Sequence, residues 1–232
     1  MLFLSRTALL LVCFLCLLPV CSAQADYYSE PADLVDRATT VYKGFLADPN
    51  MEWFQNNVGR ARGIFIVPQM LRGGFIIGGS GGRGVLLAQD ANTAKWSSPA
   101  FYSMGSVSLG FQAGADASEI ILLIMTDRGL SAMLSTDYKI GADVAVAAGP
   151  IGASAKAQTA DILAFGRSQG IFGGVSIEGA AISPLDDWNR RYYGNPVQIF
   201  DILINQKVTN PHADRLRQML PKPGPNVQPI GR

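Results

Sequence analysis

A run of glycines is the first feature of this sequence that could do chemistry. Residues 79–84 read Gly-Ser-Gly-Gly-Arg-Gly, which matches the G-x-G-x-x-G spacing of dinucleotide-binding loops. In those loops the glycines let the backbone approach a pyrophosphate, and a helix that begins at the third glycine directs its N-terminus at the phosphates. The first hypothesis to test is therefore nucleotide binding.

The residues that follow the glycines do not fit such a site. Residues 85–87 are Val-Leu-Leu, which is typical of a strand rather than of a helix. The acid that holds the ribose should follow after about 20 residues, but Asp90 comes too early and Asp116 too late. A P-loop lysine and a kinase-type His-Arg-Asp are also missing from the sequence. We conclude that the chain does not bind a nucleotide here.

A structural role explains the glycines better. On an extended backbone, residues 78, 80, 82 and 84 share one face, and three of them are glycine. A face without side chains lets another segment press on the strand, or lets the strand bend. The glycine run is therefore interpreted as a kinked strand or a hairpin at a crowded place.

Basic residues near the glycines suggest a second chemistry, the binding of phosphate groups. The candidate lipid-contacting residues are Lys43, Arg60, Arg62, Arg72 and Arg83. If they lie on one side of the molecule, they form a phosphate-contacting surface, and Trp53 and Phe54 are placed to enter a lipid interface. The alternative is a scatter of solvated cations with no common face.

Catalytic and metal-binding chemistry has little support in the sequence. The one histidine, His212, is expected at the surface in the first turn of a helix, because a site needs several convergent groups. The acids Asp186 and Asp187 suit the first turn of a helix and lack the spacing of a calcium loop. We therefore expect no enzyme, no metal and no cofactor.

The first 25 residues have the features of a secretory signal peptide: an early arginine, a short apolar run and an Ala-x-Ala site that ends at Ala25. Acylation at Cys21 is the alternative. Either way the protein is expected to be exported and to be periplasmic or secreted. A peripheral position on the outer membrane is one alternative. All three cysteines lie in this segment, so residues 26–232 have no thiol chemistry.

The rest of the chain has the size and charge of an ordinary globular domain. Residues 26–220 are expected to form a single domain, followed by a Pro/Gly-rich tail at 221–232. The sequence contains 19 basic and 18 acidic residues. Such a balanced chain lacks the overall field that draws proteins to nucleic acid, so no nucleic acid partner is expected.

The elements that must position these residues can be read from the hydrophobic spacing. Apolar residues recur at helical spacing from Leu34 to Phe45, which predicts an amphipathic first helix that packs on its own domain or lies on a membrane. Strands are expected in "GIFIVP", which Pro68 ends, in pieces on either side of the glycine run, and in four further segments. These segments are 106–114, 119–126, 143–149 and 170–177.

Helices return near the end of the chain. They are expected at 127–135 and 186–193, from Asn195-Pro196 through Ile204, and from Asn210-Pro211 through Leu220. The order of helix, many strands and then helices predicts an α+β fold. Its core is a largely antiparallel, glycine-rich sheet, barrel-like in shape, with an N-terminal amphipathic helix and C-terminal helices.

Four segments in consistent order resemble the SYLF domain, a lipid-binding family that includes secreted bacterial proteins and eukaryotic actin-patch proteins. They are "ARGIFIVPQMLRGGFIIGGSGGRGVLL", "WSSPAFYSMGSVSLGFQAGADASEIILLIMT", "GADVAVAAGPIGA" and "GIFGGVSIEGAAI" with "NRRYYG". The resemblance runs from about Val58 to Gly194. Members often carry a basic residue just before the Gly-Phe of the glycine strand, and Arg72 fills that place here.

The resemblance implies a compact, non-catalytic α+β domain that binds membrane phospholipids, with anionic lipids as the expected partner. Some eukaryotic members bind phosphoinositides through an N-terminal helix and basic residues, and some bind actin. An exported chain without an SH3-like module lacks the setting for actin, so actin is not expected as a partner. The alternative function is a cell-envelope interaction or scaffold domain without lipid affinity.

Overall fold

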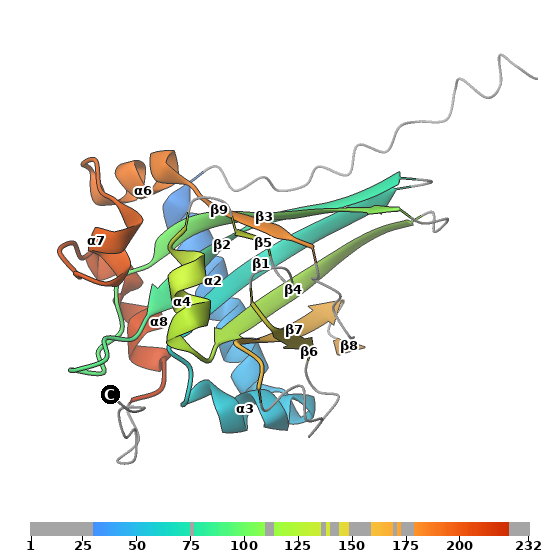
Figure 1. Ribbon diagram of the computed structural model, residues 1–232, viewed down its shortest axis with the longest axis horizontal. Helices are drawn as coiled ribbons and strands as arrows, with labels where there is room; N and C mark the ends of the chain where they lie inside the picture. The colour runs from blue at the N-terminus through green and yellow to red at the C-terminus, as the bar shows by residue number, and fades with distance from the viewer. Residues whose placement is uncertain are drawn as a thin grey trace, which may run out of the picture.

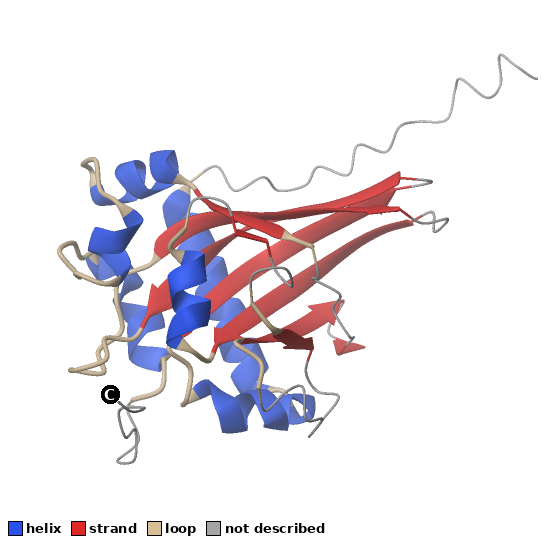
Figure 2. Cartoon of the chain, in the orientation of Figure 1, coloured by secondary structure: helices blue, strands red, loops and turns tan. Residues whose placement is uncertain are grey.

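The computed structural model describes residues 30–74, 77–109, 114–135, 138–139, 144–148, 159–168, 171–172 and 179–222. A nine-stranded sheet forms the centre of the molecule, with helices from both ends of the chain around it (Figures 1 and 2). The strand order is β5-β9-β3-β2-β1-β4-β7-β6, and β8 pairs with β7. All strand pairs are antiparallel except β6–β7. The predicted α+β fold with a largely antiparallel sheet is confirmed.

The helices are α2 (Pro31–Ala47), α3 (Glu52–Val58), α4 (Asp127–Met133), α6 (Asp186–Tyr193), α7 (Ile199–Leu203) and α8 (Asp214–Met219), with 3-10 turns η1 (Pro49–Met51) and η2 (Pro211–Ala213). The long strands are β1 (Gly63–Gly74), β2 (Ile77–Ala88), β3 (Ala100–Leu109) and β4 (Gly114–Ile124). The short strands are β5 (Tyr138–Lys139), β6 (Val146–Ala148), β7 (Ile162–Ser168), β8 (Ile171–Phe172) and β9 (Ala181–Pro184).

The first helix buries the apolar side that its sequence spacing predicts. Pro31 begins α2, where its missing N–H would have no helical partner in any case. Leu34, Ala38 and Tyr42 are fully buried within a cluster that also contains residues of β1, β2, β4 and α8. The apolar side of α2 therefore packs on its own domain, which leaves only its polar side for contact with a membrane.

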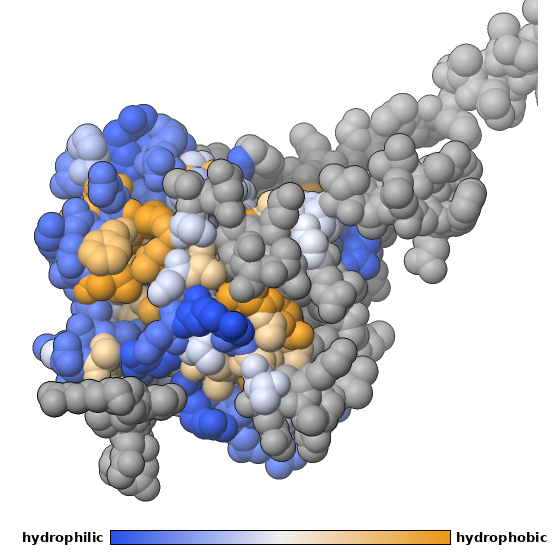
Figure 3. All heavy atoms as spheres, in the orientation of Figure 1, coloured by the Kyte–Doolittle hydropathy of each residue, from blue (hydrophilic) through white to orange (hydrophobic). Residues whose placement is uncertain are grey.

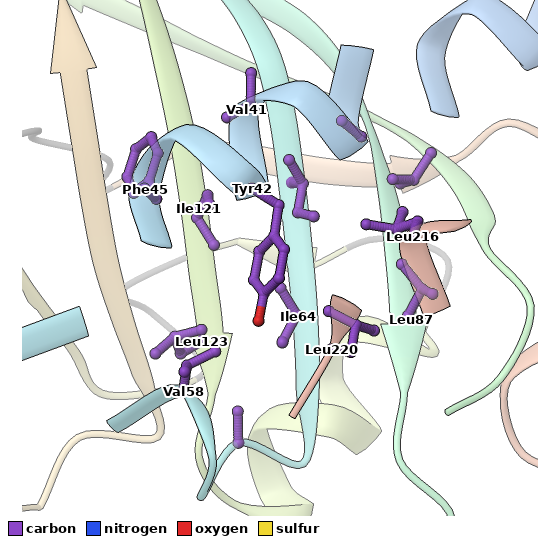
Figure 4. Close-up of a cluster of buried hydrophobic side chains, with 14 of the residues drawn as sticks. Val41, Tyr42, Phe45, Val58, Ile64, Leu87, Ile121, Leu123, Leu216 and Leu220 are labelled. Atoms are coloured by element: carbon purple, nitrogen blue, oxygen red, sulfur yellow. The ribbon is translucent and has the colours of Figure 1, made fainter. Parts of the chain in front are cut away.

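The sheet separates two hydrophobic clusters because successive side chains of a strand point to opposite faces. On the α2 side, Ile64 of β1 and Leu123 of β4 contribute to the first cluster, which surrounds Tyr42 (Figure 4). On the other side, Phe65 of β1 and Leu122 of β4 pack with residues of α4 and α7. The predicted central strand within residues 119–126 is thus buried on both faces.

The hairpin of β1 and β2 differs from the prediction. Pro68 does not end the first strand: β1 continues to Gly74 through a register shift between Ile66 and Gln69. Proline cannot donate a ladder hydrogen bond, and a bulge accommodates it within a strand. The glycine run does not connect two strands either. It forms the first half of β2, and the register pairs Gly74 with Gly78 across the hairpin.

Most of the predicted C-terminal helices are confirmed, with one boundary corrected. The helix at Asp186–Tyr193 is present as α6, and Asn210 accepts a hydrogen bond from the His212 N–H at the start of η2. The helix expected after Asn195-Pro196 begins only at Ile199, as α7. Of the strand expected at 170–177, only Ile171–Phe172 lies within the described residues.

Two predicted segments cannot be compared with the structure. The signal peptide at 1–25 and all but two residues of the tail at 221–232 lie outside the described residues. Within the described part of the chain, the helices are too short or too polar to cross a bilayer.

Candidate functional site

The glycine run lies in a crowded part of the sheet, as the sequence suggested. A Cβ atom on Gly82 would lie 2.5 Å from the Gln69 carbonyl oxygen, and one on Gly84 would collide with the Ile66 carbonyl oxygen. Both oxygens belong to the bulge of β1 around Pro68. β2 continues as a strand after Gly84, with no helix at this point. The glycines therefore admit the bulge of the neighbouring strand, and the nucleotide hypothesis has no geometry to support it.

Arg72 lies near the end of β1, next to the hairpin. Its side chain is exposed, and among the described residues no carboxylate lies within ion-pair distance of it. Met70, two positions earlier, belongs to the cluster on the side of the sheet away from α2. Alternation along the strand therefore places Arg72 on that same side.

Lys43 and Arg60 are exposed cations in a different part of the molecule. Lys43 lies on the polar side of α2, and Arg60 follows α3 just before β1 begins. Neither forms an ion pair with another described residue. Arg60 and Arg72 are separated by most of β1, and the part from Gly63 to Arg72 alone spans about 30 Å at the usual rise per residue.

The other two candidates have partners within the fold. The Nε of Arg62 donates to Asp127 Oδ1 at 2.9 Å, which connects the start of β1 to the start of α4. The guanidinium of Arg83 lies 4.8 Å from the ring centroid of Trp188, and partial burial lowers the pKa of Arg83. Arg83 therefore points to the α2 side of the sheet, opposite to Arg72.

The candidate cations thus fall into separate groups. Arg60 lies just before β1 begins and Lys43 lies on the polar side of α2, whereas Arg72 lies near the far end of β1 and on the other side of the sheet. The predicted aromatic contacts also belong to the core: Phe54 is fully buried, and Trp53 packs against Phe165 with ring centroids 5.3 Å apart. Of the two alternatives left open by the sequence, the structure favours cations without a single common face.

The structure adds polar neighbours of Arg72 that the sequence did not single out. The register places Ser80 of β2 and Asp116 of β4 directly opposite Arg72 on its two flanking strands. Ser106 of β3 lies opposite Ser80, and their hydroxyl oxygens are 2.7 Å apart. The strand predicted over 106–114 is not one strand, because β3 ends at Leu109 and β4 begins at Gly114, and residues 110–113 lie outside the described part. The polar side that the sequence assigned to Ser106 is present, but only the strand register shows that it lies against Ser80.

Leu71 beside Arg72 was also missed. It is 37% exposed and is one of two large hydrophobic side chains exposed among the described residues; the other is Phe200. Its strand neighbours are Gly81 on β2 and Ala117 on β4. Small neighbours leave Leu71 uncovered, so an apolar and a cationic side chain are exposed at the same end of β1, on opposite faces of the sheet.

The remaining charged clusters have structural roles. Asp161 is buried and accepts hydrogen bonds from Arg128, from Thr126 Oγ1 at 2.6 Å and from the Ala145 N–H at 3.0 Å. His212 is exposed as predicted, with Nε2 3.4 Å from Asp36 Oδ2. Within the described part of the chain, no group of three or more His, Cys, Asp or Glu residues is arranged to hold a metal ion.

Comparison with known proteins identifies the class of this domain. Residues 105–222 match the Ysc84 family, described as "Las17-binding protein actin regulator". This match covers half of the chain, and the chain therefore belongs to the Ysc84/SYLF family, as its sequence motifs indicated. The family description names binding and regulation, with no reaction.

Three relatives illustrate the relationship. The chain is 27% identical over 169 residues to human "SH3 domain-containing YSC84-like protein 1", covering 70% of this chain and 49% of the relative. It is 30% identical over 169 residues to "Protein YSC84" of Saccharomyces cerevisiae, covering 69% of this chain and 36% of the relative. It is 30% identical over 178 residues to yeast "LAS seventeen-binding protein 3", covering 73% and 38%. The chain thus spans half or less of these relatives.

Proposed function

We propose that this domain binds phospholipid membranes without catalysing a reaction, and that the far end of the sheet is its contact surface. We call this surface the distal sheet end: residues 71–74 of β1, 78–81 of β2 and the neighbouring ends of β3 and β4. In Figure 1 these strand ends extend beyond the helices that cover the rest of the sheet. Among the described residues, no helix lies between these strand ends and a flat surface that approaches them.

The observation that carries the proposal is the pair Leu71 and Arg72. Leu71 and Arg72 are exposed on opposite faces of the same strand end, and Arg72 has no ion-pair partner among the described residues. A membrane that approaches the ends of the strands therefore meets both side chains, and an apolar and a cationic side chain at one depth suit the lipid interface, where acyl chains and phosphates lie at neighbouring depths. Anionic membranes attract such a cation, with a contribution of about 1 kcal/mol per Lys or Arg near the surface. We therefore expect the domain to prefer anionic phospholipids, as the sequence predicted.

The apolar side of α2 does not take part, because it is buried in the core. Lys43 on the polar side of α2 and Arg60 just before β1 remain available for a second membrane contact. A flat bilayer that touches the distal sheet end does not reach Arg60, since the part of β1 from Gly63 to Arg72 alone spans about 30 Å. Substitutions at the distal sheet end and substitutions of Lys43 or Arg60 are therefore expected to affect membrane binding differently.

Vesicle co-sedimentation tests both the function and the surface. We expect the wild-type domain to bind vesicles of phosphatidylcholine mixed with phosphatidylglycerol, and to bind less as salt screens the charges. Arg72→Gln should weaken binding several-fold, whereas Lys43→Gln and Arg60→Gln should leave it unchanged. The opposite pattern would move the contact to the polar side of α2 and the start of β1. No binding to any vesicle composition would refute the function.

The site of action proposed here is outside the cytoplasm, in the periplasm or secreted, because of the signal-like segment at residues 1–25. Mass spectrometry of the exported protein should find Asp26 at the N-terminus. An acylated Cys21 would show a lipoprotein anchored to a membrane, and an intact N-terminus in a cytoplasmic fraction would refute export.

The family description supports a second candidate, the binding of an actin-regulating protein or of actin itself. It rests on the printed names of the family and of its yeast members, "Las17-binding protein actin regulator" and "LAS seventeen-binding protein 3". Co-sedimentation of the purified domain with actin filaments tests the actin part. Binding to filaments together with indifference to every vesicle composition would favour this candidate over the membrane.

A further inference from the structure

The distal sheet end carries four polar side chains in one line, and we infer that they select a phospholipid headgroup. We call Ser106, Ser80, Arg72 and Asp116 the polar row. We propose that the polar row recognises a headgroup that contains both a phosphate and a primary ammonium, as in ethanolamine phospholipids. This inference rests on the proposed membrane function and names the lipid class that the site would prefer.

The register of the sheet places the members of the polar row side by side. Ser106 pairs with Ser80, Ser80 with Arg72, and Arg72 with Asp116, across the four long strands. Side chains directly opposite one another on antiparallel strands have Cβ atoms about 5 Å apart. All four point to the face of the sheet away from α2, as Met70 and Ile120 do at the alternating positions.

The phosphate end of the polar row consists of Arg72 and the serine pair. Arg72 is exposed and has no carboxylate within ion-pair distance among the described residues, so its guanidinium is available for two parallel hydrogen bonds to phosphate oxygens. Ser80 and Ser106 share one hydrogen bond, with their oxygens 2.7 Å apart. Each hydroxyl has one hydrogen, so the pair has one further O–H that can donate to a phosphate oxygen.

The ammonium end of the polar row is Asp116. The Ser168 hydroxyl donates to Asp116 Oδ1 at 2.5 Å, which fixes the orientation of the carboxylate. Asp116 Oδ2 has no partner among the described residues and can accept from an N–H donor. A carboxylate at this place attracts a cationic group. A headgroup that carries both signs therefore complements the whole polar row, whereas a purely anionic headgroup is matched by Arg72 and the serine pair alone.

An ethanolamine phospholipid has this arrangement of charge. Its phosphate and ammonium are joined by a two-carbon linker, a span comparable to that between directly opposite side chains of neighbouring strands. A primary ammonium donates hydrogen bonds, whereas the quaternary ammonium of choline has no N–H to offer. The polar row should therefore distinguish ethanolamine from choline headgroups through Asp116.

Vesicle binding with matched lipids tests this inference. We expect the wild-type domain to bind phosphatidylcholine vesicles that contain phosphatidylethanolamine about tenfold more tightly than vesicles of phosphatidylcholine alone, the effect of one charge-assisted hydrogen bond. Asp116→Asn keeps an oxygen that can accept from Ser168 and should abolish the preference. Arg215→Gln, an exposed cation of α8 outside the distal sheet end, is the control and should keep the preference.

The outcomes separate this inference from the proposed function. If the wild-type domain binds anionic vesicles but shows no ethanolamine preference, or if Asp116→Asn keeps the preference, the headgroup inference is refuted and the membrane function stands. If no vesicle binds, both are refuted. Soluble glycerophosphoethanolamine should compete with the vesicles, whereas inorganic phosphate at the same concentration should compete poorly because it lacks the ammonium. Equal competition by both would reduce the site to Arg72 and the serine pair, contrary to the proposed role of Asp116.

Discussion

The guanidinium of Arg167 holds Glu119 at 2.6 Å and so joins β7 to the neighbouring β4. The same guanidinium lies 3.7 Å from Asp48 Oδ2, just after α2, and 5.0 Å from the ring centroid of Phe45. One side chain thus connects two strands to the first helix. Because Arg167 is only 16% exposed, these contacts are weakly screened by solvent.

We expect this connection to be measurable in a double-mutant cycle. Replacing Arg167 with Met and Glu119 with Gln, singly and together, should give a coupling energy of about 1–2 kcal/mol in urea unfolding. The exposed pair Arg190–Asp187 on α6 is the matched comparison and should couple by less than about 0.5 kcal/mol. Equal coupling energies for the two pairs would contradict the stabilising role of Arg167.

The hydroxyl of Tyr42 points into the hydrophobic core and has no hydrogen-bond partner among the described residues (Figure 4). Burial raises the pKa of Tyr42 far above its usual range, so the hydroxyl stays neutral. Because an unsatisfied buried hydroxyl costs about 1–3 kcal/mol, Tyr42→Phe should raise the free energy of unfolding by about 1 kcal/mol. Urea unfolding measures the change.

Tyr102 provides the control for that prediction. Its buried hydroxyl donates to the Met133 carbonyl oxygen at 2.9 Å, so Tyr102→Phe leaves that oxygen without this partner. We expect Tyr102→Phe to lower the free energy of unfolding by about 1 kcal/mol. A loss of stability in both variants would show that the Tyr42 hydroxyl has a partner in solution.

The glycines of β2 should differ sharply in their tolerance of a side chain. Gly84→Ala places a Cβ against the Ile66 carbonyl oxygen and the Phe65 ring, so we expect a loss of about 2 kcal/mol or more. Gly81 has open space at the same position, so Gly81→Ala should change stability by less than about 0.5 kcal/mol. Thermal unfolding of the two variants measures the difference. Similar losses would contradict the crowding at the bulge.

Asp161 should make the stability depend on acid pH. Burial opposes its charge, but hydrogen bonds from Arg128, Thr126 and the Ala145 N–H outweigh burial and lower the pKa of Asp161 below its usual 3.8. A lowered pKa stabilises the fold above the unfolded-state value, and this contribution is lost as pH falls through the folded-state pKa.

The variant Asp161→Asn tests this dependence of stability on pH. At neutral pH it should be less stable than the wild type by about 2 kcal/mol, and the difference should shrink as pH falls below about 4. Urea unfolding at several pH values measures this trend. Asp127→Asn, which affects a 77% exposed carboxylate, should show a small difference at every pH. A deficit of Asp161→Asn that stays constant down to acid pH would contradict the lowered pKa.

Local patterns in the sequence predicted much of the fold. The spacing from Leu34 to Phe45 gave the buried side of α2, and the apolar run of Ile120–Ile124 gave the central strand, because both signals depend only on neighbours along the chain. The sequence did not predict the bulge at Pro68, because a proline within an apolar run usually indicates the end of a strand. Only the pairing of β1 with β2 and β4 shows how the strand continues past it.

The candidate site was harder to predict for the same reason. Arg72 was singled out, but its neighbours Ser80 and Asp116 lie 8 and 44 positions away in the chain and meet it only through the strand register. Arg62 and Arg83 looked equivalent to Arg72 in the sequence. Their partners, Asp127 and Trp188, come from α4 and α6, and no local pattern predicts these contacts.

The hydrophobic surface over α7 is the main alternative to the distal sheet end. In Figure 3, hydrophobic atoms gather over α7, where Phe200 is 49% exposed. If this surface contacts the membrane instead, Phe200→Ser should reduce vesicle binding and Leu71→Ser should not. We expect the reverse in co-sedimentation with anionic vesicles. Leu71 shares its strand end with the cation Arg72, which has no ion-pair partner among the described residues, whereas Asp201 lies next to Phe200 and pairs with Lys207 at 2.9 Å.

The most direct test of the membrane contact is a polarity-sensitive fluorophore on a single cysteine. Residues 26–232 contain no cysteine, so Leu71→Cys gives one labelling site at the distal sheet end, and Thr40→Cys gives an exposed control on the polar side of α2. On addition of anionic vesicles, we expect the label at position 71 to shift to shorter wavelength and the label at position 40 to stay unchanged. A shift at position 40 alone, or at neither position while the protein binds the vesicles, would contradict the proposed contact surface.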